Sequence, residues 1–534
     1  MKYGSAVRIA AFDLGSNSFH LLIADAHPDG TFEPVGTDKE MLRLGSAVAA
    51  TGEIGRVGAS AAVGVIRRFR AMAESQNADE IVACATAAFR EAADSLAVVD
   101  RIESEAGVKV RVISGREEAR LIFRAVRASV LIDPGPALAL DLGGGSLEVM
   151  IGDGRGLEWA TSLKLGVARL TAEQVRSDPL STGDCRRVTA AVTKAVQRVL
   201  PEIQRFRPQM AIGSSGTLQT LIRLAAMRRT GTVPASVNQL SVGGREIDSL
   251  LDWLLGMTSA ERAALPGIDA RRADLLPTGA LLLSAVLELT GIDEIVGCEW
   301  ALREGMVLHA IGHHSRTEWE ADPRALRRES VLALCRRYGW SEAHSTKVAR
   351  LAVELFDGMS AVHDLSPADR DLLEFGAFLH DVGEYVSKDA HERHTAYLIE
   401  NGRLRGFSPA EIDVLSCLGR FHKRGTPKTS FEPYARLKEA RQRKVTQLVA
   451  ILQVADGLDR SHGGPVRDVH VYANRDVVEV VVEADDDIDL EIWGLRRKRD
   501  LFERVFDCRL DVVDAQLELT LDQDDRVSRV GHRR

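Results

Sequence analysis

Two stretches, VRIAAFDLGSNSFHLLIADA at residues 7–26 and ALALDLGGGSLEVMIGD at residues 137–153, decide the fold of this chain. Each begins with a short apolar run, turns through Asp-Leu-Gly, two further turn residues and Ser, and continues as a second apolar run. Two such runs joined by a polar, glycine-containing bend predict a β-hairpin. The copies begin roughly 130 residues apart, far more than the period of a solenoid repeat. The sequence therefore predicts two related domains that face each other across a cleft.

The residues around the two hairpins alternate between helix-like and strand-like patterns. Helical periodicity covers residues 59–75, 94–106 and 117–129, and short β-type runs cover residues 80–85 and 108–113. Alternation of this kind is typical of an α/β domain in which helices cover a sheet. The turn-rich segment Asp133-Pro134-Gly135-Pro136 marks the predicted boundary between the two copies.

The second half of the chain has a different pattern. From about Pro323 to His462 the apolar residues recur at helical spacing, and beyond Gly463-Gly464-Pro465 short alternating runs predict strands. We therefore expect an all-α domain followed by a small α+β module. The predicted domains span residues 1–133, 134–314, 323–462 and 465–534.

The composition is that of an ordinary globular protein and excludes several classes. The 534 residues include 69 Lys and Arg against 77 Asp and Glu, for a net charge of −8, and the aromatic fraction is 5%. An acidic chain with few aromatic residues is neither a basic nucleic-acid binder nor a single-strand stacking platform. No apolar run approaches the roughly 18 residues of a transmembrane helix, the N-terminus lacks a signal-peptide pattern, and the six cysteines form no CxxC pair. We expect a cytoplasmic protein with reduced thiols and no nucleic-acid or membrane partner.

The two hairpin turns have the chemistry of phosphate-binding loops. Glycine lets backbone N–H groups approach a phosphate, Ser and Asn add donors, and an Asp just before each turn can hold Mg²⁺ or its water. The predicted phosphate-binding residues are Asp13, Gly15, Ser16, Asn17, Gly143, Gly144, Gly145 and Ser146. A third loop, GSSGT at residues 213–217, adds Ser215, although a plain strand-to-helix turn explains that loop equally well.

Two further residues are candidates for catalysis. In ISGREEARLIF, residues 113–123, Ser114 and Glu117 have the spacing of a capping box. That role leaves Glu118 unexplained, and a carboxylate beside a bound phosphate can activate water as a general base. Spacing alone favours a solvated acid at the start of a helix. Arg90, in ATAAFREA, is a similar case, because it is either a surface residue or a bidentate phosphate ligand.

Six segments, taken in order, resemble the exopolyphosphatase/guanosine pentaphosphate phosphatase (Ppx/GppA) family. They are FDLGSNSFHLLIAD, ATAAFREA, ISGREEARLIF, LDLGGGSLEVMIGD, AIGSSGTLQTL and CEWALREGMVL. The resemblance covers roughly residues 7–312, and the remainder is similar to the C-terminal extension of the family's long members. It implies an actin-like, sugar-kinase-like (ribonuclease H-like) fold with duplicated α/β domains.

The resemblance also implies roles for individual residues. Glu118 matches the family's catalytic base, Asp141 and Glu148 match acidic residues associated with the metal and the attacking water, and Arg90 matches a phosphate-contacting arginine. The implied protein is a homodimeric exopolyphosphatase that uses Mg²⁺ or Mn²⁺ to remove terminal phosphates from inorganic polyphosphate. Guanosine pentaphosphate is the alternative substrate. An ATP-dependent kinase of the same superfamily and a non-catalytic polyphosphate or nucleotide sensor are the other classes to exclude.

The helical half carries a second set of candidate metal ligands. Polar residues stand on otherwise apolar helical stripes, where buried groups need partners, and the set comprises His344, His380, Asp381, His394, His422 and Asp456. Their order resembles an HD-type phosphohydrolase domain. Imidazole and carboxylate ligands together suit a divalent transition metal, whereas a metal-free hydrogen-bonded core is the alternative.

Two basic stretches are candidate tracks for a polyanionic substrate. One contains Arg436, Lys438, Arg441, Arg443 and Lys444, and the other is RRKR at residues 496–499. Most charge runs are solvated faces, but cationic stretches on an acidic protein can also steer a polyanion.

Overall fold

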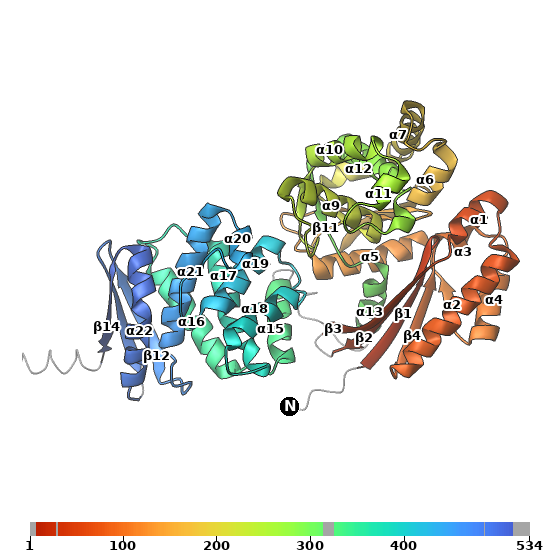
Figure 1. The fold of residues 1–534 in the computed structure, drawn as a ribbon. Helices are drawn as coiled ribbons and strands as arrows, with labels where there is room; N and C mark the ends of the chain where they lie inside the picture. Colours follow the sequence, from red (N-terminus) through yellow and green to blue (C-terminus); the bar gives the residue numbers. More distant parts are fainter. Residues whose placement is uncertain (1–6, 28–29, 313–324, 485, 516–534) are drawn as a thin grey trace, which may run out of the picture. The chain divides into compact units, whose positions relative to one another are not determined.

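The chain is described by a computed structural model that covers residues 7–27, 30–312, 325–484 and 486–515. It divides into two compact units (Figure 1). One comprises Met1–Leu326 with Arg405–Pro409, and the other comprises Arg327–Leu404 with Ala410–Arg534. The predicted boundary at residues 314–323 lies outside the described residues, and the four-domain division stays a prediction.

The first unit contains two sheets whose strand orders repeat each other. The first sheet consists of β1 (Val7–Leu14), β2 (Ser18–Ala26), β3 (Phe32–Met41), β4 (Glu80–Ala85) and β5 (Val110–Val112), in the order β3-β2-β1-β4-β5. The second consists of β6 (Ala137–Leu142), β7 (Leu147–Gly152), β8 (Leu157–Leu163), β9 (Met210–Ser214), β10 (Ser241–Gly243) and β11 (Glu294–Gly297), in the order β10-β11-β9-β6-β7-β8. In both, an antiparallel meander of three strands continues through parallel pairing. The predicted hairpins and the predicted duplication are confirmed.

Alternation along the central strands sends side chains into different hydrophobic cores. On β1, Phe12 joins the core beneath α2 (Gly55–Ser75) and α4 (Ser95–Ala106), which cover one face of the first sheet (Figure 1). Ile9, from the same strand, faces a second core that contains residues of both sheets, of α5 (Gly115–Ser129) and of α13 (Leu302–Gly312). Because α5 contributes to the core shared by the two sheets, it can bring a side chain to the cleft between the hairpin turns.

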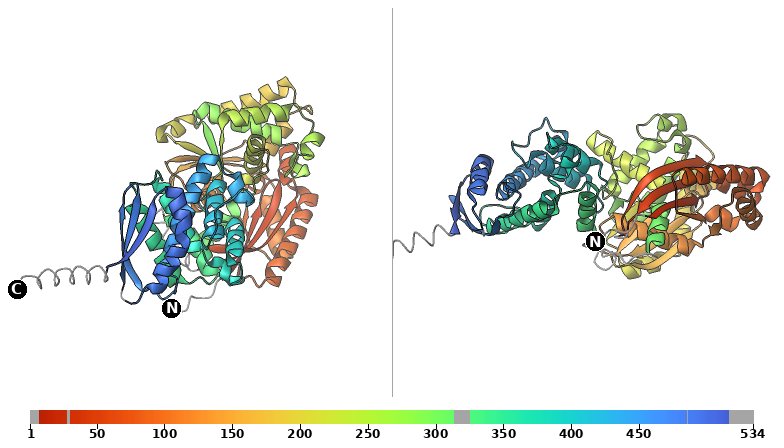
Figure 2. Two further views of the ribbon diagram at one scale, coloured as in Figure 1. Left: turned by 60° about the vertical axis from the view of Figure 1, so that its left-hand side comes forward. Right: turned by 90° about the horizontal axis from the view of Figure 1, so that it is seen from below.

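A third core lies on the other face of the second sheet. Leu138 and Leu140 of β6 pack there, beneath four helices that cover this face of the sheet (Figure 2). These helices are α7 (Thr182–Val196), α9 (Ser215–Thr230), α10 (Gly244–Leu255) and α12 (Leu276–Thr290). Every residue of β6 and β7 is buried, as expected for central strands with covered faces.

The second unit begins with helices, as the sequence predicts. They are α15 (Ala325–Arg337), α16 (Glu342–Gly358), α17 (Pro367–Leu379), α18 (His391–Asn401), α19 (Pro409–Phe421), α20 (Glu432–Arg436) and α21 (Glu439–Gly457). A three-stranded sheet follows, with β12 (Val466–Ala473), β13 (Val477–Ala484) and β14 (Arg509–Asp514), and α22 (Asp489–Phe506) connects the parallel pair β13 and β14. Sequence patterns indicated β12 and β13 but gave no sign of β14.

Among the described helices, none is both long enough and apolar enough to span a bilayer.

Candidate active site and metal centre

The first unit contains a cavity of about 250 Å³ between the two hairpin turns. It collects every predicted phosphate-binding residue and two of the three predicted catalytic or metal-site acids, Glu118 and Asp141. The phosphate-binding residues that line it are Asp13, Gly15, Ser16, Asn17, Gly143, Gly144, Gly145, Ser146 and Ser215. Glu148 and Arg90 do not line the cavity, but each lies beside a residue that does. Glu148 is opposite Asp141 in the hairpin, and Arg90 is hydrogen-bonded to Glu118.

The two glycine-containing turns approach each other too closely for larger residues. A Cβ atom on Gly144 would lie 2.9 Å from Asn17 Cβ, and one on Gly145 would lie 2.8 Å from Ser16 Oγ. Contacts below 3.0 Å require one partner to move. Gly144 and Gly145 of the second turn therefore pack against the first turn too closely for a larger residue, which leaves backbone groups of both turns at the same cavity.

Helix α5 presents Glu118 to the cavity. Ser114 is its N-cap, with its Oγ accepting a hydrogen bond from Glu117 N at 3.1 Å. The next residue, Glu118, points inward and is 7% exposed. Arg90, on the short helix α3 (Ala87–Glu91), donates to Glu118 Oε2 at 2.5 Å and to the carbonyl oxygen of Ile113 at 3.0 Å. The arginine thus contacts the candidate base directly.

The acidic groups share a strongly perturbed environment. Burial raises the pKa of Asp13 to about 8, that of Glu118 to about 7 and that of Asp141 to about 6, and neighbouring carboxylates add to each shift. Burial followed by repulsion from Glu118 and Asp141 raises the pKa of Glu148 well above its usual range. Ionising all four together requires a compensating cation.

The second hairpin pairs the two predicted metal-site acids. Asp141 on β6 and Glu148 on β7 are opposite each other in the antiparallel register. Ser214 Oγ donates to Asp141 Oδ2 at 2.5 Å, and Ser162 Oγ donates to Glu148 Oε1 at 2.7 Å. Such an all-oxygen set suits a hard divalent cation such as Mg²⁺ or Mn²⁺.

Sequence analysis missed three cationic residues that line the cavity, Lys39, Arg272 and Arg303. Arg272 Nη2 donates to Ser18 Oγ at 3.3 Å, and Lys39 Nζ lies 3.3 Å from Asp269 Oδ2. Burial lowers the pKa of both Lys39 and Arg272. Arg303 could have been found from the sequence because it lies within CEWALREGMVL, one of the six segments that resemble the family. Lys39 and Arg272 occur in no recognisable motif.

The third loop has an unusual backbone at Ser215. Its φ is 80°, a left-handed conformation that serine rarely adopts, at the start of α9 beside the cavity. The guanidinium of Arg272 packs on Gly216 so tightly that a Cβ there would overlap Arg272 Nη1. Backbone strain of this kind concentrates at functional sites, which favours a binding role for this loop over a plain turn.

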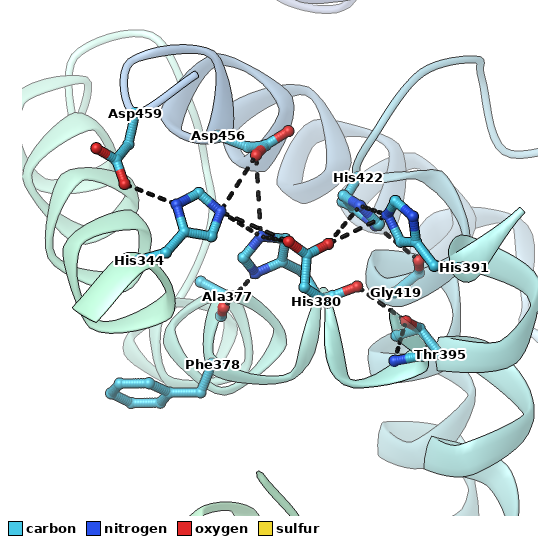
Figure 3. A network of polar contacts seen from close by, with 12 residues as sticks. His344, Ala377, Phe378, His380, His391, Thr395, Gly419, His422, Asp456 and Asp459 are labelled. Carbon is cyan, nitrogen blue, oxygen red and sulfur yellow. Dashed lines mark hydrogen bonds and ion pairs between the residues drawn. The ribbon is translucent and has the colours of Figure 1, made fainter. Parts of the chain in front are cut away.

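The second unit brings together most of the predicted metal ligands (Figure 3). His344, His380, Asp381, His422 and Asp456 lie in one buried cluster. His394 does not belong to it. His391, one helical turn earlier at the start of α18, takes that place, with Nε2 at 3.2 Å from Asp381 Oδ1.

Asp381 lies between two groups of nitrogen atoms. Its Oδ2 is 3.3 Å from His380 Nε2 and 3.6 Å from His344 Nε2. Its Oδ1 is 3.2 Å from both His391 Nε2 and His422 Nε2. Asp456 Oδ1 lies on the same side as the first two histidines, 3.8 Å from both His344 Nε2 and His380 Nε2. Asp381 thus directs Oδ2 to His344 and His380 and directs Oδ1 to His391 and His422. This is the arrangement of a carboxylate that bridges two sites.

The outer nitrogen of each histidine has an acceptor, which fixes the tautomers. Nδ1 lies 2.6 Å from Asp459 Oδ2 in His344. In the other three histidines it faces a carbonyl oxygen: Ala377 at 2.7 Å for His380, Gly419 at 2.8 Å for His422 and Lys388 at 3.1 Å for His391. If each Nδ1 carries the proton, each neutral ring directs an Nε2 lone pair inward.

Between neutral rings the inner nitrogens face each other without a proton to share. Burial opposes protonation of His380, but Asp381 outweighs it and raises the pKa of His380 to about 9, so that a protonated His380 can donate one. His344 Nε2 and His380 Nε2 are 3.2 Å apart, and His391 Nε2 and His422 Nε2 are 3.1 Å apart. Opposed lone pairs repel unless a proton or a metal ion lies between them. The histidines around Asp381 hold its pKa well below the usual range although burial opposes this, so the bridging group is ionised.

Sequence analysis also missed the groups that support this cluster. Asp459 orients His344, the ring of His462 stacks on His344 with centroids 3.7 Å apart, and Lys498 of α22 forms an ion pair with Asp456. Lys498 belongs to the RRKR stretch, which therefore has at least one side chain turned into the unit rather than to solvent.

The other basic stretch is occupied by ion pairs. Arg441 and Lys444 both pair with the buried carboxylate of Asp369, and Arg436 pairs with Asp413 at 2.5 Å. These contacts give the three residues a structural role, because they join α17 to α21 and α19 to α20.

Comparison with known proteins identifies relatives across both units. The Ppx/GppA phosphatase family matches residues 22–314, and Ppx/GppA phosphatase domain III matches residues 326–496. Exopolyphosphatase 1 of Mycobacterium tuberculosis is 35% identical over 325 residues, which are 60% of this chain and 91% of that protein. The guanosine-5'-triphosphate,3'-diphosphate pyrophosphatase of Aeromonas hydrophila is 27% identical over 450 residues, covering 84% and 86% of the two chains.

Solved structures agree with the duplicated fold. The crystal structure of an exopolyphosphatase from Cytophaga hutchinsonii matches with a TM-score of 0.54 and 28% identity, over 57% of this chain and 98% of that one. The Aquifex aeolicus member of the Ppx/GppA family matches with a TM-score of 0.50 and 25% identity, over 58% and 99%. The actin-like, duplicated α/β architecture that the motifs implied is thus confirmed, and the chain belongs to the Ppx/GppA family of phosphatases.

Proposed function

We propose that this protein is an exopolyphosphatase that removes terminal phosphates from inorganic polyphosphate. The observation that carries the proposal is the convergence of two glycine turns with Asp13, Glu118 and Asp141 at one cavity, where Arg90 contacts Glu118 and Glu148 lies opposite Asp141. Phosphoryl transfer needs positioning and charge neutralisation more than covalent chemistry from the protein. This cavity offers both.

In the proposed reaction Glu118 is the general base. Water attacks the terminal phosphorus, Glu118 takes the proton of that water, and the bond to the bridging oxygen breaks to release phosphate and a chain one unit shorter. Arg90, by its charge and hydrogen bond, works against the effect of burial on the pKa of Glu118 and keeps more of the base ionised. Asp141 and Glu148 would hold Mg²⁺ or Mn²⁺, which supplies charge neutralisation at the phosphoryl oxygens.

The cavity lining favours polyphosphate over guanosine pentaphosphate. Its lining contains backbone turns, hydroxyl groups, carboxylates, Lys39, Arg272 and Arg303; none of its described lining residues is Phe, Tyr or Trp, and its one imidazole, His20, is hydrogen-bonded to Ser18 Oγ at 2.8 Å. Guanine is commonly held by stacking on an aromatic ring. Similarity to the Aeromonas pyrophosphatase keeps guanosine pentaphosphate as the second candidate. Phosphate release from long-chain polyphosphate, tripolyphosphate, guanosine pentaphosphate and ATP, measured side by side with Mg²⁺, decides between them.

Replacement of the base tests the mechanism. We expect Glu118→Gln to lower kcat by about 10²- to 10⁴-fold, the usual contribution of a general base, while long-chain polyphosphate still binds. Glu117→Gln, which alters the neighbouring exposed carboxylate, is the matched control and should retain most activity. Near-normal phosphate release by purified Glu118→Gln protein would remove Glu118 from this role.

We also propose that the helical unit is an HD-like domain with a two-metal centre. His344, His380 and Asp456 would hold one ion, His391 and His422 the other, and Asp381 would bridge them. The support is the two pairs of opposed Nε2 atoms 3.1–3.2 Å apart, which cations would stabilise. Nitrogen and carboxylate ligands favour Mn²⁺, Fe²⁺, Co²⁺, Ni²⁺ or Zn²⁺.

Elemental analysis of the untagged full chain tests this centre. Wild-type protein and the cleft variant Asp141→Asn should both retain a transition metal, whereas Asp381→Ala should lose most of it. Wild-type protein that remains folded and free of metal after incubation with Mn²⁺ or Zn²⁺ would show a metal-free core instead. Cytoplasmic location and the homodimer remain predictions.

A further inference from the structure

A second cavity of the first unit lies on the side of α5 opposite to Glu118. Its volume is about 480 Å³. Its basic lining residues are Arg116, Arg120, Arg124, Arg127, Arg155 and His309. Among the residues that line it, Glu117 alone is acidic, and Glu117 already pairs with Arg111. We call this cavity the α5 groove.

Four of the arginines form a stripe along one helix. Arg116, Arg120, Arg124 and Arg127 stand at positions i, i+4, i+8 and i+11 of α5, which places them on one face. The stripe extends about 16 Å along the helix axis. Like charges at this spacing destabilise a helix, and Arg127 offsets part of this cost by donating to the carbonyl oxygen of Arg155. A ligand that meets the exposed Arg116 and Arg120 together would offset the repulsion between them.

Three groove arginines are available to such a ligand. Arg116, Arg120 and Arg155 are exposed, and no acidic side chain in the described part of the chain forms an ion pair with them. Arg127 donates to the carbonyl oxygen of Arg155 at 2.8 Å, which ties the turn between β7 and β8 to α5. This contact holds the turn that carries Arg155 against α5, beside the stripe.

We propose that the α5 groove binds a stretch of a linear phosphate chain remote from the phosphate group that is cleaved. Guanidinium groups bind phosphate oxygens with two hydrogen bonds each, and a row of them matches a ligand that repeats its charge along its length. The apolar side chains of Leu121 and Phe123 also line the groove, and reduced contact with water strengthens such ion pairs.

The proposal rests on the proposed phosphatase function, because it concerns where the substrate is held beyond the cleft. It assigns long-chain binding to α5 and not to Arg436, Arg441 and Lys444, which pair with the carboxylates of Asp413 and Asp369. A tripolyphosphate is too short to need the groove once its end occupies the cleft. The expected signature is therefore dependence on chain length.

Binding measured on protein that cannot turn over the substrate tests the proposal. In a Glu118→Gln background, Arg116→Gln, Arg120→Gln and Arg155→Gln are combined, and the matched control combines Arg186→Gln, Arg198→Gln and Arg245→Gln. The control arginines are exposed, lie in the same unit and change the net charge equally. Ligands are long-chain polyphosphate, tripolyphosphate and guanosine pentaphosphate, each at low and high salt.

We expect the groove variant to bind long-chain polyphosphate at least about tenfold more weakly than the control, with tripolyphosphate unchanged and a shallower salt dependence. Loss of a second bound guanosine pentaphosphate would identify the nucleotide as the source of the phosphate chain. Equal affinities of groove and control variants, or equal losses for long and short chains, would overturn the proposal. Failure of the proposed function is a separate result, namely no phosphate release by the wild-type protein from any of these ligands.

Discussion

At the scale of single residues, Arg90 illustrates how one contact can set the working range of the site. Glu118 is buried, and burial raises its pKa to about 7, while Arg90 acts in the opposite direction through its charge and hydrogen bond. A general base must be ionised to accept a proton. The arginine therefore matters to catalysis even if it never touches the substrate.

Arg90→Gln should move the acid limb of the pH profile. Without the guanidinium, the pKa of Glu118 rises further, so kcat/KM should begin to fall at a pH about one or more units higher than in the wild type. The measurement is the pH profile of phosphate release at saturating Mg²⁺. Arg111→Gln removes the partner of the neighbouring Glu117 and should leave the limb in place. An unshifted limb in Arg90→Gln would assign the arginine to substrate binding alone.

At the scale of elements, sequence periodicity predicted the hairpins and the site-bearing helix well. The Asp-Leu-Gly turns were recognisable because both strands and turn chemistry repeat, and the start of α5 was recognisable from its cap at Ser114. Lys39 and Arg272 could not be found this way. They reach the cavity from β3 and from a short 3-10 helix, Ala270–Arg272, and their approach depends on how distant segments pack.

Sequence periodicity also does not show how segments pack at the start of α18, and this explains why His394 was predicted where the structure places His391. His394 precedes Leu398 by one helical turn, which predicts that it faces inward, but this spacing does not tell where the helix starts or what lies beside its first turn. The structure begins α18 at His391, directly after Ala390 in a left-handed conformation. The first residue of the helix, and not the residue one turn later, therefore meets Asp381.

A pair of histidine variants tests this assignment. We expect His391→Ala to lose about half of the bound transition metal, because it removes one ligand of the second ion, and His394→Ala to retain all of it. Metal content by elemental analysis, together with circular dichroism to verify folding, gives the comparison. Equal metal loss in both variants, or loss in His394→Ala alone, would contradict the geometry.

At the scale of the whole molecule, the buried carboxyl groups of the cleft couple folding to pH and to cations. The folded-state pKa values of Asp141, Glu118 and Asp13 are about 6, 7 and 8, above their unfolded values near 4. For acids shifted upward, the protonated form favours the folded state. That stability is complete below about pH 4 and is lost as pH rises through about 6 to 8.

Metal-free protein should therefore melt at progressively lower temperature as pH rises from about 5 to 8.5, and Mg²⁺ should raise the melting temperature more at pH 8 than at pH 5. Asp13→Asn and Asp141→Asn remove a titrating group without changing its size, so each should reduce the pH-dependent fall by about 3 °C or more. Asp100→Asn, an exposed substitution on α4, is the matched control and should follow the wild type. Differential scanning calorimetry in chelator, then in Mg²⁺, measures both effects. If the cleft variants and the control decline in parallel, the carboxyl groups of the cleft are not the source of the pH dependence.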